Sequence, residues 1–192
     1  LIHRDLKPAN ILLAPLDDRQ AKSTVMSDSL LNFKRPVSSL PFVPKITDFG
    51  LAKQIDMDSS QTKAGEIMGT PSYMAPEQAA AKPDIGPSAD TYALGAILYE
   101  LLTGRPPFRS FTTLDTILQV LEEEPIPPSK LQPQTPKDVE TICLKCLAKT
   151  PDKRYLTSAE LADDLQRYLN DEPILARPAS LGERLWKWAK RR

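Results

Sequence analysis

A single stretch, residues 92–102, is apolar at nearly every position and restricts the possible folds more than any other part of the sequence. A helix that is hydrophobic on all of its faces must be surrounded by other elements. The stretch is too short to cross a bilayer, which takes about 18 or more consecutive apolar residues. Gly104 and the pair Pro106 and Pro107 follow it, and these residue types end helices. We therefore predict a helix that lies in the core of a globular domain.

Three segments after this helix have one apolar face each. Their apolar residues recur three and four positions apart, which is the spacing of an amphipathic helix. The pair Thr135 and Pro136 predicts the start of one of them, with the proline at its first position, and Thr157 with Glu160 forms a candidate capping box for another. The three sets are Leu114, Ile117, Leu118 and Leu121; Val139, Ile142, Cys143, Cys146 and Leu147; and Leu161, Leu165, Tyr168 and Leu169.

The beginning of the sequence predicts strands instead. The short runs Ile11–Leu13 and Lys45–Thr47 are suited to strands. Residues 14–44 between them hold five serines, four prolines and no glycine, so we interpret them as a long loop or an insertion at the tip of a hairpin. Because the strands come first and the helices follow, we predict an α+β fold, mostly helical with one small β-hairpin.

The composition excludes several classes of protein. Hydrophobic residues make up 41% and charged residues 26% of the chain, which is typical of a folded globular protein and not of a disordered or fibrous one. Cys143 and Cys146 have the Cys-x-x-Cys spacing of some zinc and redox sites. The sequence has no second pair, its one histidine is far away at His3, and both cysteines fall on an apolar helix face. We therefore predict that they pack in the core.

Three polar fragments stand in a fixed order along the chain. They are His3-Arg4-Asp5-Leu6-Lys7-Pro8-Ala9-Asn10, Asp48-Phe49-Gly50 and Ala75-Pro76-Glu77. Together they resemble the catalytic loop, the metal-binding triplet and the end of the activation segment in eukaryotic-type Ser/Thr protein kinases, as found in bacteria.

The resemblance continues through residues 69–74, Asp90 and residues 151–154, and so covers about residues 1–170. It implies the C-terminal lobe of a kinase fold, with residues 14–44 as an insertion and residues 48–77 as the activation segment.

The resemblance also assigns roles to single residues. Asp5 and Lys7 would be catalytic: Asp5 would accept or orient the proton of the substrate hydroxyl, and Lys7 would place a positive charge at the transferred phosphate. Asn10 and Asp48 would supply oxygen ligands to Mg²⁺, and Leu12 would lie against the adenine of ATP. The implied cofactors are ATP and Mg²⁺, and Lys7 favours serine or threonine of a protein substrate over tyrosine as the acceptor.

The activation segment carries candidate phosphorylation sites. In similar kinases the arginine before the catalytic aspartate, here Arg4, holds a phosphate on this segment. Thr62 is the preferred site because it lies eight residues before Thr70. Thr70 itself would tie the peptide-docking loop to the catalytic residues. Alternatively, Thr62 and its neighbours Ser59 and Ser60 are ordinary solvated loop residues.

Further residues would act as scaffold. The resemblance implies that Glu77 and Arg154 form a buried ion pair that tethers the activation segment. Asp90, at the head of the buried helix, would accept hydrogen bonds from backbone amides of the catalytic loop. His3 would pack beneath Phe49 of the metal-binding triplet.

The kinase elements that the family places before the catalytic loop are not found in this sequence. Its first glycine is Gly50, so it has no glycine-rich phosphate loop, and the N-terminal lobe is absent. We therefore expect the chain to be a piece of a longer protein and to be inactive alone. An alternative function is a pseudokinase or docking module that binds partners without catalysis. Because Asp5, Lys7, Asn10 and Asp48 are all present, we favour the enzyme.

The tail, residues 171–192, has a distinct charge pattern. From Arg177 to Arg192 it holds six basic residues and one acidic residue, with Trp186 and Trp188 among them. Basic residues and tryptophan are enriched where a chain enters a membrane from the cytoplasm. We predict that the chain continues after Arg192 into a membrane anchor, as several similar bacterial kinases do, which makes this a cytoplasmic kinase domain of a single-pass inner-membrane protein. A solvated helix is the alternative, and no nucleic-acid partner is expected.

Overall fold

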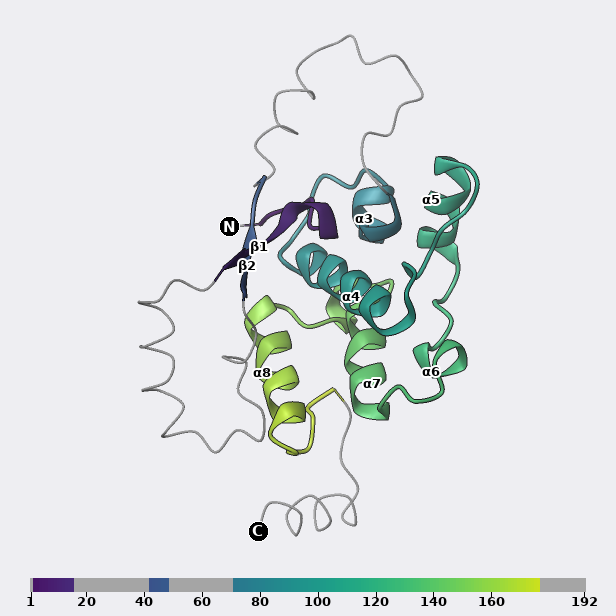
Figure 1. Cartoon of the computed structure of the whole chain (residues 1–192). Coiled ribbons are helices and arrows are strands. Elements are labelled where there is room, and N and C mark those ends of the chain that lie inside the picture. Colours follow the sequence, from purple (N-terminus) through teal and green to yellow (C-terminus); the bar gives the residue numbers. More distant parts are fainter. Residues whose placement is uncertain (1, 16–41, 49–70, 177–192) are drawn as a thin grey trace. The chain divides into compact units, whose positions relative to one another are not determined.

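The computed structural model of this chain describes residues 2–15, 42–48 and 71–176 (Figure 1). The chain divides into two compact units. One consists of Pro8–Thr47, and the other of Leu1–Lys7 together with Asp48–Arg192.

The smaller unit contains an antiparallel β-hairpin. After the short 3-10 helix η1 (Pro8–Asn10), strand β1 (Ile11–Pro15) pairs with strand β2 (Phe42–Ile46), in a register that runs from Ile11 opposite Ile46 to Pro15 opposite Phe42. The predicted hairpin is therefore present, but its strands extend to Pro15 and Phe42, into the range 14–44 that was predicted as an insertion. The prolines in these strands are tolerated because each strand of a two-stranded sheet has one outer edge, along which no backbone N–H group is needed for pairing.

The larger unit is helical, and helix α4 (Ser88–Thr103) lies at its centre. Figure 1 shows α4 between α3 on one side and α7 and α8 on the other. The other elements are η3 (Pro71–Tyr73), α3 (Pro76–Ala79), α5 (Thr113–Glu122), α6 (Pro128–Leu131), α7 (Lys137–Cys146), η4 (Pro151–Lys153) and α8 (Ser158–Leu169).

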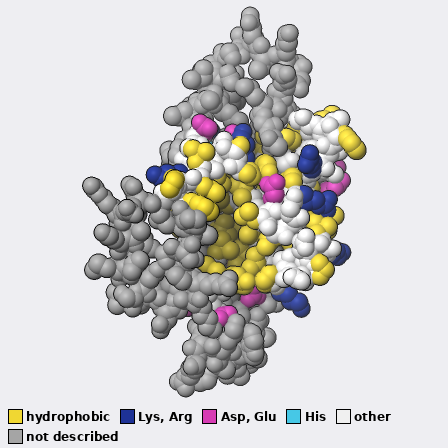
Figure 2. Space-filling model, viewed as in Figure 1, with side chains coloured by type: hydrophobic (Ala, Val, Ile, Leu, Met, Phe, Trp, Pro, Cys, Tyr) yellow, Lys and Arg dark blue, Asp and Glu magenta, His cyan; other side chains and the backbone are white. Residues whose placement is uncertain are grey.

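The prediction of a buried helix over residues 92–102 is confirmed for most of its length. Tyr92, Ala96 and Tyr99 of α4 are completely buried, whereas Leu101 near its end is 79% exposed. Gly104 ends the helix in the left-handed conformation, with φ of 78°, which glycine adopts without steric cost. On the face shown in Figure 2, hydrophobic side chains gather near the centre, over α4 and α8.

The predicted apolar face of α5 is partly wrong. The structure buries Thr116, Ile117 and Val120, whereas Leu114 and Leu118 are exposed. The buried side is the one that packs on η3 and α3, and Thr116 can lie there because its hydroxyl donates to the Thr112 carbonyl and accepts from the Ser110 amide.

The two remaining helices begin close to the predicted residues. Pro136 is the N-cap of α7 and not its first helical residue, so the helix begins one residue later than predicted. At the start of α8 the Thr157 hydroxyl accepts a hydrogen bond from the Glu160 amide, at 3.2 Å. The Glu160 carboxylate accepts a hydrogen bond from the amide of Leu156 at 2.9 Å. The return bond of the capping box therefore comes from the residue before the N-cap and not from the N-cap itself.

A lysine fixes the end of α5. The Lys149 ammonium donates to the carbonyls of Val120 and Gln119 in the last turn of α5, at 2.7 and 3.3 Å, and lies 4.1 Å from the centre of the Phe108 ring. Helix C-termini attract cations. Burial lowers the pKa of Lys149 to about 8, since removal from water disfavours the charged amine.

The packed unit extends beyond the boundary predicted at residue 170. Ile174 is buried, and the amides of Leu175 and Ala176 donate to the carboxylate of Asp164 in α8. Tyr155 also donates its hydroxyl to Asp164, at 2.6 Å, so this completely buried carboxylate has three donors. The packed unit therefore includes residues 171–176, and the basic part of the tail, residues 177–192, lies outside the described residues.

Helices α4 and α7 pack closely at Gly95. A Cβ atom built on Gly95 would overlap the Cβ atom of Cys146, and the thiol of Cys143 donates to the Gly95 carbonyl at 3.6 Å. Both cysteines are completely buried, which confirms the prediction of core packing, and burial raises the pKa of the Cys143 thiol to about 12. Within residues 2–15, 42–48 and 71–176, no cluster of three or more His, Cys, Asp or Glu residues could hold a metal ion.

Gly95→Ala should therefore destabilise the protein, although alanine is normally the better helix former. In an open helix the change would stabilise by up to about 1 kcal/mol, whereas the overlap with Cys146 should cost roughly 1–3 kcal/mol or more. Urea denaturation of the variant and the wild type measures the difference. Gly86→Ala is the matched control, because a Cβ atom there meets only the Ser88 hydroxyl, at 3.9 Å. Equal stability of the two variants would contradict the close approach.

Candidate active site

The loop His3–Lys7 is held by the first turn of α4. Asp90 is in that turn, and its carboxylate accepts hydrogen bonds from the backbone amides of His3, at 2.7 Å, and Arg4, at 2.8 Å. Bonds from an amide to a charged acceptor are stronger than those between neutral groups. Because Asp90 is buried, water competes little for these bonds. The predicted role of Asp90 as an acceptor for the amides of this loop is therefore confirmed.

Two further contacts fix the course of the loop. Arg4 has a left-handed backbone, with φ of 67°, which is uncommon for a residue with a side chain. Its carbonyl accepts a hydrogen bond from the Gln78 side chain of α3 at 2.7 Å, and the Asp5 amide donates to Nδ1 of the buried His3 at 3.3 Å. The peptide group between Arg4 and Asp5 is thus held through both its carbonyl and its N–H.

Asp5 and Lys7 lie together at the end of this loop. The Lys7 ammonium donates to Oδ2 of Asp5 at 3.1 Å, and both side chains remain partly exposed. A small hollow beside them is also lined by Tyr73 and Met74, which belong to the segment before α3. The structure therefore brings the two predicted catalytic residues next to each other and next to the end of the predicted activation segment.

Glu77 and Arg154 form the predicted ion pair. The two oxygens of the Glu77 carboxylate accept from Nη1 and Nη2 of Arg154, at 2.8 and 2.7 Å. The other guanidinium donors reach the carbonyls of Ser88, Ala148 and Lys149 at 2.7–3.0 Å. All five N–H groups of the arginine are therefore used, which is what a buried charge requires.

The other predicted metal and nucleotide residues lie on or beside the hairpin. Asn10 is buried, and its carbonyl accepts from the amide of Thr47 at 2.9 Å, just before the strands begin to pair. Leu12 is exposed on β1. Asp48 follows β2, is exposed, and has a left-handed backbone with φ of 57°, a conformation in which aspartate is enriched among residues with a side chain.

Several predicted residues lie outside the described part of the chain. These are Phe49, Gly50, Thr62 and Thr70. The packing of His3 beneath Phe49, the phosphate-binding role of Arg4 and the role of Thr70 therefore stay predictions.

Two residues contribute to the site without having been predicted from the sequence. Gln78 links α3 to the loop, since its Oε1 accepts from the Ala75 amide at 3.1 Å while its Nε2 donates to Arg4. Its place three residues after Ala75, the N3 position of a capping box, is a signal in the sequence. The Tyr73 hydroxyl donates to Glu100 of α4 at 2.5 Å, and burial raises the pKa of Tyr73. No local pattern predicts this pair, because the partners are 27 residues apart.

Comparisons with known proteins show the family to which the chain belongs. Residues 1–165 match the protein kinase domain family. The chain is 37% identical to the serine/threonine-protein kinase PknB of Mycobacterium tuberculosis over 174 residues, which are 90% of this chain and 24% of that protein. It is 39% identical to the serine/threonine-protein kinase Pkn1 of Myxococcus xanthus over 166 residues, 86% of this chain and 21% of that protein.

The chain therefore belongs to the protein kinase domain family. Its main helical unit and two-stranded sheet represent the predicted α+β kinase-like fold. The chain spans about a quarter of the length of the curated relatives that it matches.

Removing the charge of Glu77 should lower the free energy of unfolding far more than removing the charge of a glutamate in an exposed ion pair. Glu77→Gln leaves Arg154 buried without its counter-charge, at a cost of roughly 3–5 kcal/mol in unfolding free energy. The control is Glu172→Gln, whose partner Arg167 is 3.4 Å away and about one third exposed, and this change should cost less than about 1 kcal/mol. Denaturant titrations give both values.

The double variant Glu77→Gln with Arg154→Met separates the pair from the two single sites. It should lose less stability than the two single changes added together, because no buried charge is then left unpaired. Strict additivity would contradict the interpretation of these residues as an energetically coupled pair.

Proposed function

We propose that the protein is a Ser/Thr protein kinase, which transfers the γ-phosphoryl group of ATP to serine or threonine hydroxyls of a protein substrate. The observation that carries this proposal is the contact of 3.1 Å between Asp5 and Lys7, on a loop whose backbone is fixed by Asp90. Relatives named serine/threonine-protein kinases support the same activity.

The geometry of the loop suits this chemistry. Phosphoryl transfer needs the attacking oxygen to be positioned and the charge on the phosphate to be neutralised. The carboxylate of Asp5 can accept the hydroxyl proton of the substrate. Lys7, whose ammonium is already next to Asp5, would hold a positive charge close to the same hydroxyl and the incoming phosphate. Tyr73 and Met74 line the hollow beside these two residues and so would contact the substrate chain.

The donor chemistry of Asn10 and Asp48 fits a magnesium ion. Mg²⁺ prefers oxygen ligands and is usually held by one or two carboxylates, with phosphate oxygens and water completing its shell. One amide oxygen and one carboxylate are the donors that these two residues offer. When bound, the ion would neutralise phosphate charge on ATP, and Leu12, exposed on β1, would cover the adenine.

Asp5→Asn should abolish most of the activity of the full-length protein without unfolding it. The amide cannot accept the hydroxyl proton, so kcat for phosphorylation of a protein substrate should fall roughly 10²–10⁴-fold, while the thermal midpoint stays close to that of the wild type because Asp5 is partly exposed. Transfer of radiolabelled phosphate from ATP gives the rate.

The matched control is Glu122→Gln, an exposed residue of α5, which should leave kcat unchanged. A full-length wild type that binds a protein partner but transfers no phosphate would contradict the proposal and support the docking function instead.

The proposal also includes a membrane anchor after residue 192 and a cytoplasmic location for the kinase domain. Its support is the basic, tryptophan-containing sequence from Arg177 to Arg192. Among the described helices, none is both long and apolar enough to cross a bilayer.

The full-length protein should sediment with the inner membrane after cell lysis and should be released by detergent but not by high salt. Recovery of the protein in the supernatant would contradict this part of the proposal. Release by salt alone would indicate an electrostatic surface attachment instead.

A further inference from the structure

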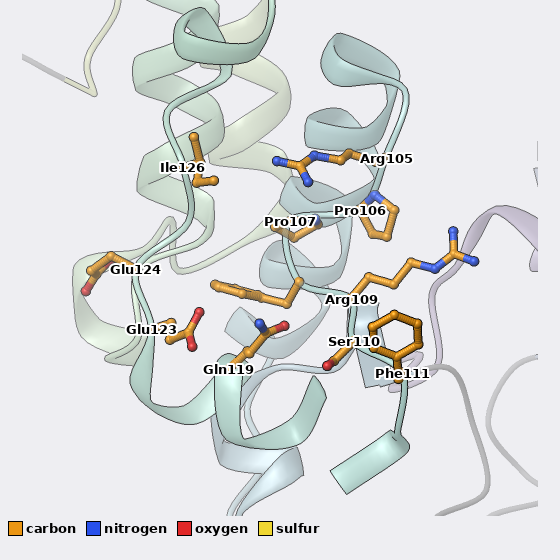
Figure 3. A pocket seen from close by; sticks show the side chains of 11 residues that line it. Arg105, Pro106, Pro107, Arg109, Ser110, Phe111, Gln119, Glu123, Glu124 and Ile126 are labelled. Atoms are coloured by element: carbon orange, nitrogen blue, oxygen red, sulfur yellow. The ribbon is translucent and has the colours of Figure 1, made fainter. Parts of the chain in front are cut away.

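A cleft of about 640 Å³ lies beyond the C-terminal end of α4, and none of the proposed catalytic residues lines it. It opens between residues 105–111, which join α4 to α5, and residues 119–126, which contain the end of α5 and the loop after it (Figure 3). Clefts that bind ligands have volumes of about 300–1,000 Å³. The proposed phosphoryl transfer does not use this cleft.

The two walls of the cleft carry opposite charges. Arg105 and Arg109 belong to one wall, and Glu123 and Glu124 to the other. Within the described residues, none of these four side chains forms an ion pair or a hydrogen bond, although Glu123 and Glu124 interact electrostatically with Lys149. In Figure 3 the side chain of Arg105 extends toward Ile126, whereas Glu123 lies near Gln119. A ligand with an acidic and a basic group at its two ends would match this arrangement.

The surface between these charges is apolar. Pro106 and Phe108 are buried beneath it, Pro107 is partly exposed, and Ile126 is 45% exposed. An apolar ligand side chain that covered Ile126 and Pro107 would remove hydrophobic surface from water, which favours binding.

One polar atom at the cleft lacks a partner. Oε1 of Gln119 is buried and has no hydrogen-bond partner among the described residues. In Figure 3 its side chain projects from α5 into the space between the two walls. A buried acceptor without a donor is unfavourable, so an N–H group of a ligand would gain a bond there that the free protein does not make.

From these features we propose that the cleft binds an extended segment of a partner protein. An acidic side chain of the segment pairs with Arg105, a basic side chain pairs with Glu123, an apolar side chain lies on Ile126 and Pro107, and an N–H group donates to Gln119. A polypeptide carries acidic, basic, apolar and N–H groups along one chain, and the cleft offers a partner to each of the four. This binding does not depend on phosphoryl transfer.

The test uses four fluorescent synthetic peptides in a polarisation assay with the full chain. Each has two leucines between alanines and one charged residue at either end: glutamate first and lysine last, the reverse, two glutamates, or two lysines. One of the two peptides with opposite charges should bind at least about tenfold more tightly than both peptides with like charges.

Charge exchange in the protein then tests the assignment of the walls. Arg105→Glu and Glu123→Lys should each weaken the preferred peptide about tenfold. The double variant Arg105→Glu with Glu123→Arg should prefer the peptide with the reversed charge order. The matched controls are Lys137→Glu and Glu122→Lys, which make the same changes of charge at exposed positions outside the cleft and should leave the affinity unchanged.

Gln119→Met separates ligand binding from a purely structural role. It should weaken the preferred peptide several-fold, while the free energy of unfolding stays the same or increases, because the unpaired buried acceptor is removed. A loss of stability with unchanged affinity would overturn the role given to Gln119.

Three results would overturn the proposal as a whole. In the first, wild-type protein binds the four peptides equally or binds none of them at roughly 1 mM. In the second, the charge-exchanged double variant keeps the wild-type preference. In the third, the wild type forms a dimer in sedimentation experiments and Arg105→Glu abolishes it, which would assign the cleft to a second copy of the chain.

Discussion

The buried guanidinium of Arg154 joins three separate segments of the helical unit. It binds the Glu77 carboxylate in α3, the Ser88 carbonyl at the start of α4, and the carbonyls of Ala148 and Lys149 after α7. A buried charge is tolerated only when all of its hydrogen bonds are made, so these segments cannot separate without a large cost. The ring of Tyr92 completes the enclosure, 5.0 Å from the guanidinium carbon.

The geometry of the loop proposed to be catalytic depends on this arrangement through α4. Arg154 fixes the first residue of α4, Ser88, and two residues later Asp90 binds the amides of His3 and Arg4. Those amides lie just before Asp5, whose carboxylate contacts Lys7. Gln78 joins the same loop to α3, the helix that contains Glu77. The residues proposed to act on the substrate are therefore positioned by a chain of polar contacts that begins at the buried pair of Glu77 and Arg154.

The two ends of α4 serve different purposes. Its first turn holds the loop with Asp5, while the segment after its last turn forms one wall of the cleft lined by Arg105 and Glu123. A helix of 16 residues is roughly 24 Å long, so the two sites are well separated along it. Close packing at Gly95 joins α4 to α7. A partner segment in the cleft would thus be held by the same element that positions the active-site loop.

The sequence by itself determined the features that arise from local patterns or from motifs. The run of apolar residues located α4, the period of apolar residues located α7 and α8, and the cap at Thr157 marked the start of α8, because these features depend on neighbours within one or two turns. The motif around Asp5 indicated the family and, by resemblance, the contacts of Asp90, Glu77 and Arg154.

Only the tertiary structure decided features that depend on segments far apart in the chain. The extent of the strands over Pro15 and Pro44 follows from pairing across the hairpin, which no local pattern encodes. The buried side of α5 was set by packing against η3 and α3, so that Thr116 is buried and Leu114 is exposed. The packing of Ile174 depended on the distant acceptor Asp164. Arg105 and Glu123 are ordinary surface residues in the sequence and became opposite walls of one cleft because α4 and α5 bring their loops together.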